Sequence, residues 1–156
     1  MWHAKRPVLW IHAALVSAFV FGASNMVHAE GPLDAYRWQN RIVVIFADQD
    51  TREDLARQYQ MMLIESDGMR DRDLIVVTVE TDLVEIDGVA NPTIRADRLR
   101  DAFNVPKQGY STLLVGKDGG VKLRSRQPVT TEDLFALIDG MPMRQREMRE
   151  QSNSKS

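Results

Sequence analysis

Apolar runs and a helical spacing of apolar residues alternate in the first half of the chain. Residues 42–47 (IVVIFA) and 73–79 (DLIVVTV) are rich in β-branched residues, which is typical of strands buried on both faces, as in parallel sheets. The segment between them places apolar residues at i, i+4, i+7 and i+8, on one face of a helix: Leu55, Tyr59, Met62 and Leu63. This order predicts a right-handed βαβ unit.

The second half begins with a short helix and a hairpin. Residues 95–103 (RADRLRDAF) predict a helix whose inward face comprises Leu99, Ala102 and Phe103. Residues 110–126 contain two strands joined at KDGG, a strong hairpin signal. The second strand, residues 121–124, alternates apolar and basic side chains, which is typical of an edge strand with a charged outer face.

A closing helix is predicted over VTTEDLFALIDGMP, residues 129–142. Thr130 or Thr131 is its expected N-cap, with Asp133 at N3 of the first choice, and Gly140 and Pro142 end it. Its inward residues are expected to be Leu134, Leu137, Ile138 and Met141. The long connection before the short helix, residues 80–93, allows a small hairpin turning at Asp87-Gly88. Residues 144–156 are polar without periodicity and are expected to fray.

The predicted order is therefore β-α-β-α-β-β-α, an α/β domain with a central mixed sheet flanked by helices. This order resembles the thioredoxin fold over residues 38–141. We expect three segments: a signal peptide over residues 1–29, one thioredoxin-like domain over residues 30–143, and a polar C-terminal tail over residues 144–156.

The first residues have the pattern of an export signal. Lys5 and Arg6 form a positive start, residues 8–22 an apolar run, and residues 27–29 (VHA) place small residues at −3 and −1 of a cleavage site after Ala29. The apolar run is shorter than the ~20 residues that span a bilayer, although an uncleaved anchor remains the alternative. We therefore expect a periplasmic or secreted protein with no stable membrane span after cleavage.

Composition excludes several kinds of chemistry. The 156 residues contain no cysteine, which removes disulfides, thiol nucleophiles and cysteine-ligated metals. The three histidines, His3, His12 and His28, all lie in the signal segment, so the mature chain has no histidine for a triad or a zinc site. The net charge of −2 becomes −4 after cleavage, because Lys5 and Arg6 are lost, and gives no hint of nucleic-acid binding.

Three stretches carry a closer resemblance: LDAYRWQNRIVVIFA (residues 33–47), LLVGKDGGVKLRS (113–125) and LFALIDGMPMRQREM (134–148). They resemble the bacterial family called domain of unknown function 4174, to which domains repeated in vertebrate extracellular matrix proteins of the sushi-repeat and coiled-coil-domain-containing groups are similar. The resemblance implies a thioredoxin-like fold and export, and it implies no catalytic residue.

Both halves of a thioredoxin redox site are missing. The turn after the first strand, where such enzymes hold Cys-x-x-Cys at a helix N-terminus, reads DQDTRED (residues 48–54). Ser111 stands where a cis-proline would precede the third strand of the core, and Pro106 lies too early to serve. We therefore expect no thiol oxidoreductase activity and no cofactor.

The acidic turn has two interpretations. As a helix cap, Asp50 would be N-cap with Glu53 at N3, or Thr51 would be N-cap with Asp54 at N3. The alternative is an enzyme or metal-binding protein that uses carboxylates of residues 48–54, with Asp48, Asp50 and Glu53 as hard-cation ligands. The spacing does not match the twelve-residue calcium loop.

Two surfaces are candidates for binding a partner. Tyr36, Arg37 and Trp38 combine the residue types that dominate interface hot spots, although they could simply pack over the sheet edge. Lys122 and Arg124, on the outer face of the edge strand, could select an acidic partner or could be a solvated face. We expect a redox-inactive, non-enzymatic module that binds an envelope protein or a surface component, whose identity the sequence leaves open.

Overall fold

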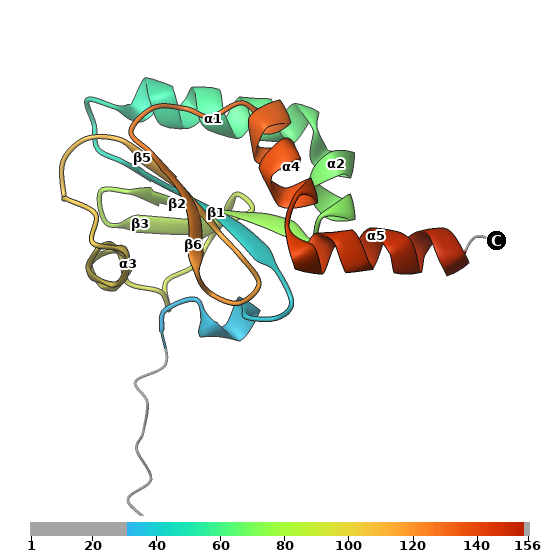
Figure 1. Cartoon of the computed structure of the whole chain (residues 1–156). Coiled ribbons are helices and arrows are strands. Elements are labelled where there is room, and N and C mark those ends of the chain that lie inside the picture. Colours follow the sequence, from blue (N-terminus) through green and yellow to red (C-terminus); the bar gives the residue numbers. More distant parts are fainter. Residues whose placement is uncertain (1–30, 155–156) are drawn as a thin grey trace, which may run out of the picture.

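The computed structural model describes residues 31–154 (Figure 1). The predicted signal peptide and the cleavage after Ala29 lie outside the described residues. The elements are the 3-10 helix η1 (Asp34–Tyr36), the strands β1 (Arg41–Ala47), β2 (Leu74–Glu80), β3 (Leu83–Ile86), β4 (Val89–Ala90), β5 (Ser111–Val115) and β6 (Val121–Ser125), and the helices α1 (Arg52–Ile64), α2 (Ser66–Asp71), α3 (Ala96–Phe103), α4 (Thr131–Asp139) and α5 (Pro142–Ser154).

The strands form one mixed sheet in the order β4-β3-β2-β1-β5-β6. β1 pairs with β2 in parallel, as the βαβ prediction requires, and all other neighbours are antiparallel. The predicted α/β class is therefore confirmed, and the arrangement is consistent with a thioredoxin-like fold. β6 lies at one edge of the sheet, as its alternating basic residues predict.

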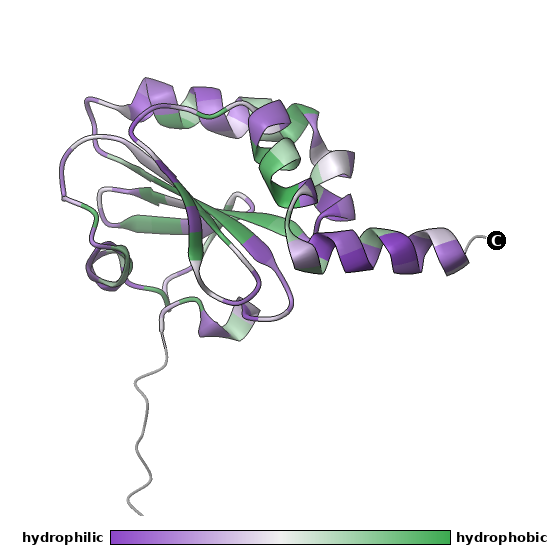
Figure 2. Ribbon diagram, viewed as in Figure 1, coloured by the Kyte–Doolittle hydropathy of each residue, from purple (hydrophilic) through white to green (hydrophobic). Residues whose placement is uncertain are grey.

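Helices cover the two faces of the sheet unequally (Figure 1). On one face, Val43 and Ile45 of β1 pack with Met62 of α1 and with Leu134 and Ile138 of α4. On the other face, the alternate β1 residues Ile42, Val44 and Phe46 pack with Ala96 and Leu99 of α3. All seven residues of β1 are buried, since both faces are covered, and Figure 2 shows the hydrophobic colouring concentrated in the central strands.

Two local predictions are confirmed in detail. α4 begins after the N-cap Thr130, whose hydroxyl oxygen accepts a hydrogen bond from the backbone N–H of Asp133 at 3.1 Å. The hairpin of β3 and β4 turns at Asp87 and Gly88, and both residues have positive φ, 48° and 79°. The carboxylate of Asp87 also accepts a hydrogen bond from the N–H of Val76, which fixes this turn against β2.

The fraying expected for residues 144–156 is wrong for residues 144–154, because Pro142–Ser154 is α5, and the last two residues lie outside the described range. The cause is one anchored residue: the Arg144 side chain is 2% exposed and donates to the backbone oxygen of Asp71 at 2.7 Å and to Asp139 at 3.2 Å. A polar segment without apolar periodicity is thus held by buried charges. The helix α2 has no counterpart among the sequence predictions either.

The predicted inward faces of the helices need three corrections. Leu63 and Leu137 are exposed, and so is Ala102 on α3. The buried face of α1 is centred on Gln58 and Met62, which places Leu63 on its flank. The buried face of α3 comprises Ala96, Leu99 and Arg100. Gln58 is fully buried because its amide bonds the backbone N–H and C=O of Val129 at 2.7 and 2.8 Å.

Candidate functional site

The turn after β1 is closed by hydrogen bonds to Asp48. Its Oδ1 accepts from the backbone N–H of Asp50 at 3.1 Å and from the N–H and hydroxyl of Thr51 at 3.0 and 2.8 Å. Its Oδ2 accepts from the N–H of Gly109 at 2.6 Å. The bond from Gly109 contributes most to holding the pKa of Asp48 below its ordinary value. This carboxylate therefore ties the turn to the segment before β5.

The second predicted register names the correct N-cap residue of α1, but the side-chain hydrogen bond expected of a cap does not form. Thr51 is the N-cap residue, and its side chain accepts no hydrogen bond from the helix. Its hydroxyl instead donates to Asp48 and accepts from the N–H of Asp48 at 3.0 Å. Asp50 is exposed and lies before the helix. Asp48, which neither capping scheme employed, is thus the organising acid, because an aspartate at a strand end can bond the N–H groups two and three residues ahead of it.

The proposed metal ligands do not converge. Across residues 31–154 no group of three or more Asp, Glu, His or Cys side chains lies close enough to hold a metal ion. Both oxygens of Asp48 accept from backbone N–H groups, while Asp50 and Glu53 are exposed and make no side-chain hydrogen bond within the described chain. The described structure therefore does not bring these three acids together as one site.

The place of the missing cis-proline is filled by ordinary strand. Ser111 is the first residue of β5 and pairs with Phe46 of β1, and no peptide bond in the described residues is cis. The preceding Gly109 has φ 86°, a conformation that directs its N–H to Asp48. Tyr110 is buried, which raises the pKa of its hydroxyl to about 12, and the hydroxyl bonds Thr112 at 2.5 Å. The described turn after β1 and the segment before β5 thus contain neither a thiol nor a cis-proline.

The structure separates the predicted binding residues Tyr36, Arg37 and Trp38 into one residue that packs on the core and two that are exposed. Tyr36 is half-buried and packs on the core face that contains Ile42 and Val115. Trp38 is 61% exposed, and the Arg37 guanidinium lies 5.5 Å from the centre of its ring. Packing over the sheet therefore accounts for Tyr36 and leaves Trp38 unexplained.

The backbone of Trp38 is constrained by the hairpin of β5 and β6. Its φ is 66°, a left-handed value that is a genuine outlier for a bulky side chain. Its N–H donates to the backbone oxygen of Lys117 at 2.7 Å, which holds the loop against the hairpin turn. A large apolar side chain is thus fixed in an exposed position at a cost in backbone strain.

The two basic edge residues point to different partners. Lys122 pairs with Asp118 of the hairpin turn at 2.7 Å, close to Lys117 and the loop of Trp38. Arg124 donates to the backbone oxygen of Phe103 at the end of α3, at 2.7 Å. Lys122 therefore belongs to the same end of the molecule as Arg37 and Trp38, whereas Arg124 is engaged with α3. We call Arg37, Trp38 and Lys122 the amino-end face, since they lie around the start of β1.

Sequence reasoning missed a buried charge cluster at this end of the sheet. Glu147 of α5 accepts from Lys117 at 2.8 Å and from Arg41, the first residue of β1, at 3.2 Å. Arg41 also donates to the backbone oxygen of Arg72 at 2.9 Å, and Lys117 also pairs with Asp73 at 2.7 Å. Arg41 is 1% exposed and Lys117 10% exposed, so both cations depend on these partners.

The cluster shifts the titration of its acid. Burial alone would raise the pKa of Glu147, but the hydrogen bonds and charges of Arg41 and Lys117 outweigh it and hold the pKa below its ordinary value. The residues of the cluster come from the three stretches that carry the family resemblance: Arg41 from the first, Lys117 from the second, and Glu147 from the third. The presence of one of these charged residues in each resembling stretch was the signal available in the sequence, whereas their contact is seen only in the fold.

The fold and this site define an α/β domain with one mixed sheet, consistent with a thioredoxin-like fold, in which the hydrogen-bonded carboxylate of Asp48 closes the turn after β1. More specifically, the chain belongs to the family described as domain of unknown function (DUF4174), which matches residues 32–147. The matched range includes the whole sheet and reaches Glu147, so α5 is part of the family's domain up to the residue that closes the charge cluster.

A curated relative is the coiled-coil domain-containing protein 80 of Danio rerio, which is 32% identical over 139 residues. The match covers 76% of this chain but only 16% of that protein, so the domain is a small part of the relative. Within the described residues, no helix has both the length and the apolar character that crossing a membrane requires.

Proposed function

We propose that this chain is an exported, redox-inactive binding module of the cell envelope, which docks another protein or a surface component on its amino-end face. The observation that carries the proposal is Trp38. A tryptophan is both among the most frequent hot-spot residues and costly to hold at positive φ. Its exposure and its fixed backbone, held by Lys117, are what a preorganised contact residue needs.

The chemistry of the face favours an acidic partner. Arg37 lies over the Trp38 ring and Lys122 lies at the same end of the molecule, whereas the chain as a whole is acidic, with a net charge of −2. Basic side chains at a sheet edge discourage unspecific strand pairing and increase the association rate with acidic surfaces. Binding should weaken as salt rises, since exposed charges are screened within ~8 Å at physiological ionic strength.

The decisive experiment is capture of partners from an envelope fraction by the mature chain and by Trp38→Gly. Glycine adopts positive φ freely, so the change relieves roughly 1–2 kcal/mol of backbone strain, while the greater freedom of the unfolded chain offsets about 0.5–1 kcal/mol of it. We expect Trp38→Gly to be at least as stable as the wild type and to lose capture. Val89→Ala, at a 70% exposed apolar residue on the opposite sheet edge, is the control and should capture normally.

The outcomes separate binding from packing. A Trp38→Gly variant that unfolds at lower temperature would show that the ring packs against the domain, and one that captures the same protein at the same salt would remove Trp38 from the interface. The double change Lys122→Glu and Arg124→Glu tests the edge independently. If only the Lys122 side belongs to the face, Lys122→Glu alone should lose capture, and Arg124→Glu alone should not.

A further inference from the structure

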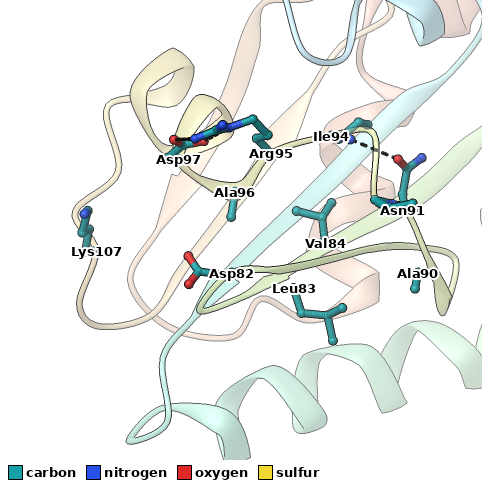
Figure 3. A pocket seen from close by; sticks show the side chains of 11 residues that line it. Asp82, Leu83, Val84, Ala90, Asn91, Ile94, Arg95, Ala96, Asp97 and Lys107 are labelled. Carbon is teal, nitrogen blue, oxygen red and sulfur yellow. Dashed lines mark hydrogen bonds and ion pairs between the residues drawn. The ribbon is translucent and has the colours of Figure 1, made fainter.

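A cavity lies at the end of the sheet opposite to the amino-end face, beyond the carboxyl end of β2 (Figure 3). Its volume is about 620 Å³, within the ~300–1,000 Å³ range of small-molecule sites. β3 and the residue before it form one side, and the loop after β4 and the first turn of α3 form the other. In sheets with parallel strands, ligands commonly bind beyond the carboxyl ends of those strands.

The walls of the cavity are preformed. Val84 and Ala96 are 3% and 5% exposed, and they face each other from β3 and α3 (Figure 3). The loop that closes the far end is held by Asn91, whose side-chain oxygen accepts from the N–H groups of Thr93 and Ile94 at 3.0 and 3.1 Å. The apolar part of a ligand would therefore meet a fixed surface and would require little rearrangement.

The cavity has two charges that the protein leaves uncommitted. Of its four charged residues, Arg95 and Asp97 pair with each other, with Nε and Oδ1 at 3.0 Å. Asp82 and Lys107 line the same cavity, and neither makes a hydrogen bond or ion pair with any other residue of the described chain. Figure 3 shows their charged groups near the same end of the cavity, Asp82 from the strand side and Lys107 from the loop after α3.

The nearby cation Arg100 does not form an ion pair with Asp82. The buried Arg100 behind the cavity donates to the backbone oxygens of Pro106 and Ala47, at 3.0 and 3.4 Å, and pairs with no carboxylate. The negative charges of Asp82 and Asp48 support its protonated form only at longer range. Asp82 therefore remains available as an acceptor and Lys107 as a cationic donor, both in the lining of the same cavity.

We propose that this cavity binds a small zwitterion, an amino acid or dipeptide with a free amine, a free carboxylate and an apolar side chain. The ammonium group of the ligand lies against Asp82, its carboxylate against Lys107, and its apolar side chain between Val84, Ile94 and Ala96. The proposal is independent of the amino-end face, since the two sites lie at opposite ends of β1 and share no residue.

The test is calorimetric titration of the mature chain with L-leucyl-L-leucine at millimolar concentrations, together with its N-acetyl and C-terminal amide derivatives. We expect saturable binding of the dipeptide and about a 5-fold loss for each blocked form, the upper range for one accessible ion pair. Asp82→Asn should lose as much for the free dipeptide and nothing further for the N-acetyl form, because the same ion pair is removed from either side. Lys107→Met should behave in the same way toward the amide.

Matched variants guard against nonspecific effects. Lys107→Arg keeps the charge and should keep binding, and Asp50→Asn removes an exposed aspartate outside the cavity and should change nothing. Absence of saturable binding overturns the proposal, and so do equal losses for the N-acetyl form in the wild type and in Asp82→Asn. Capture of the envelope partner is measured separately with Trp38→Gly, so failure of either site leaves the other testable.

Discussion

Removal of the Glu147 carboxylate is the most direct test of how the last helix is held. Glu147→Ala leaves Arg41 and Lys117, which are 1% and 10% exposed, without their shared counter-charge. Breaking a buried pair from one side typically costs 3–5 kcal/mol, because an uncompensated charge stays buried. We expect the lower end, about 3 kcal/mol, since Arg41 keeps the backbone oxygen of Arg72 and Lys117 keeps Asp73.

The assay is thermal unfolding followed by circular dichroism. For a domain of this size a loss of 1 kcal/mol lowers Tm by about 4 °C, so Glu147→Ala should lower it by about 12 °C. The matched control is Glu150→Ala on the same helix. Glu150 is exposed and makes no side-chain hydrogen bond or ion pair within residues 31–154, so that change should stay within about 0.5 kcal/mol of the wild type.

The pH dependence gives a second, independent signature. Because Arg41 and Lys117 hold the pKa of Glu147 below its ordinary value, its contribution is complete above the unfolded pKa of about 4.3. It is lost as pH falls through the lower pKa of the folded state. The Tm difference between the wild type and Glu147→Ala should therefore be largest at neutral pH and shrink in acid. A difference as small as that of Glu150→Ala, or one that is the same in acid, would refute the structural role of the cluster.

Three further predictions follow from other features. Gln58→Met should cost about 2 kcal/mol, because the buried N–H and C=O of Val129 lose their partner, and urea unfolding measures it. Asp48→Asn should lower Tm at neutral pH but not at acid pH, where the native carboxylate is also protonated, and Ca²⁺ or Mn²⁺ should not raise the Tm of the wild type. Intact mass of the exported chain should begin at Glu30, whereas a mass that retains residues 1–29 would indicate an anchor.

The α/β class and the principal strands in their order along the chain were predictable, because the sequence pattern of each strand reflects how much of it is buried. β1 is apolar at every position after Arg41, and β6 alternates, so the central and the edge strand are told apart by period alone. The start of α4 was equally predictable, since Thr130 and Asp133 form a local N-cap. Each of these signals depends either on residues close together in the chain or on an apolar face of a strand that must be buried.

What could not be predicted depends on residues far apart. In the sequence, Arg144 and Glu147 look like ordinary solvated charges of a polar tail. Only the fold shows that Glu147 contacts Arg41 and that Arg144 contacts Asp71. The hydrogen bond from the N–H of Gly109 to the carboxylate of Asp48 likewise joins segments that no periodicity relates. Arg100 was not among the predicted inward residues of its helix, yet it lies inward because backbone oxygens of Pro106 and Ala47 accept from it.

The position of the charge cluster also has a consequence for the order in which a newly made chain folds. The contact between Arg41 and Glu147 spans 106 positions, nearly the whole domain. Ribosomes add roughly 5–20 residues per second, so the first strand is available for seconds before the residue that neutralises its end has emerged. Until Glu147 is present, the guanidinium of Arg41 lacks this carboxylate partner at the edge of the sheet. We therefore expect a chain truncated before Glu147 to be more susceptible to proteolysis than the full chain. The charge cluster is therefore complete only when α5 has been made and has packed against the sheet.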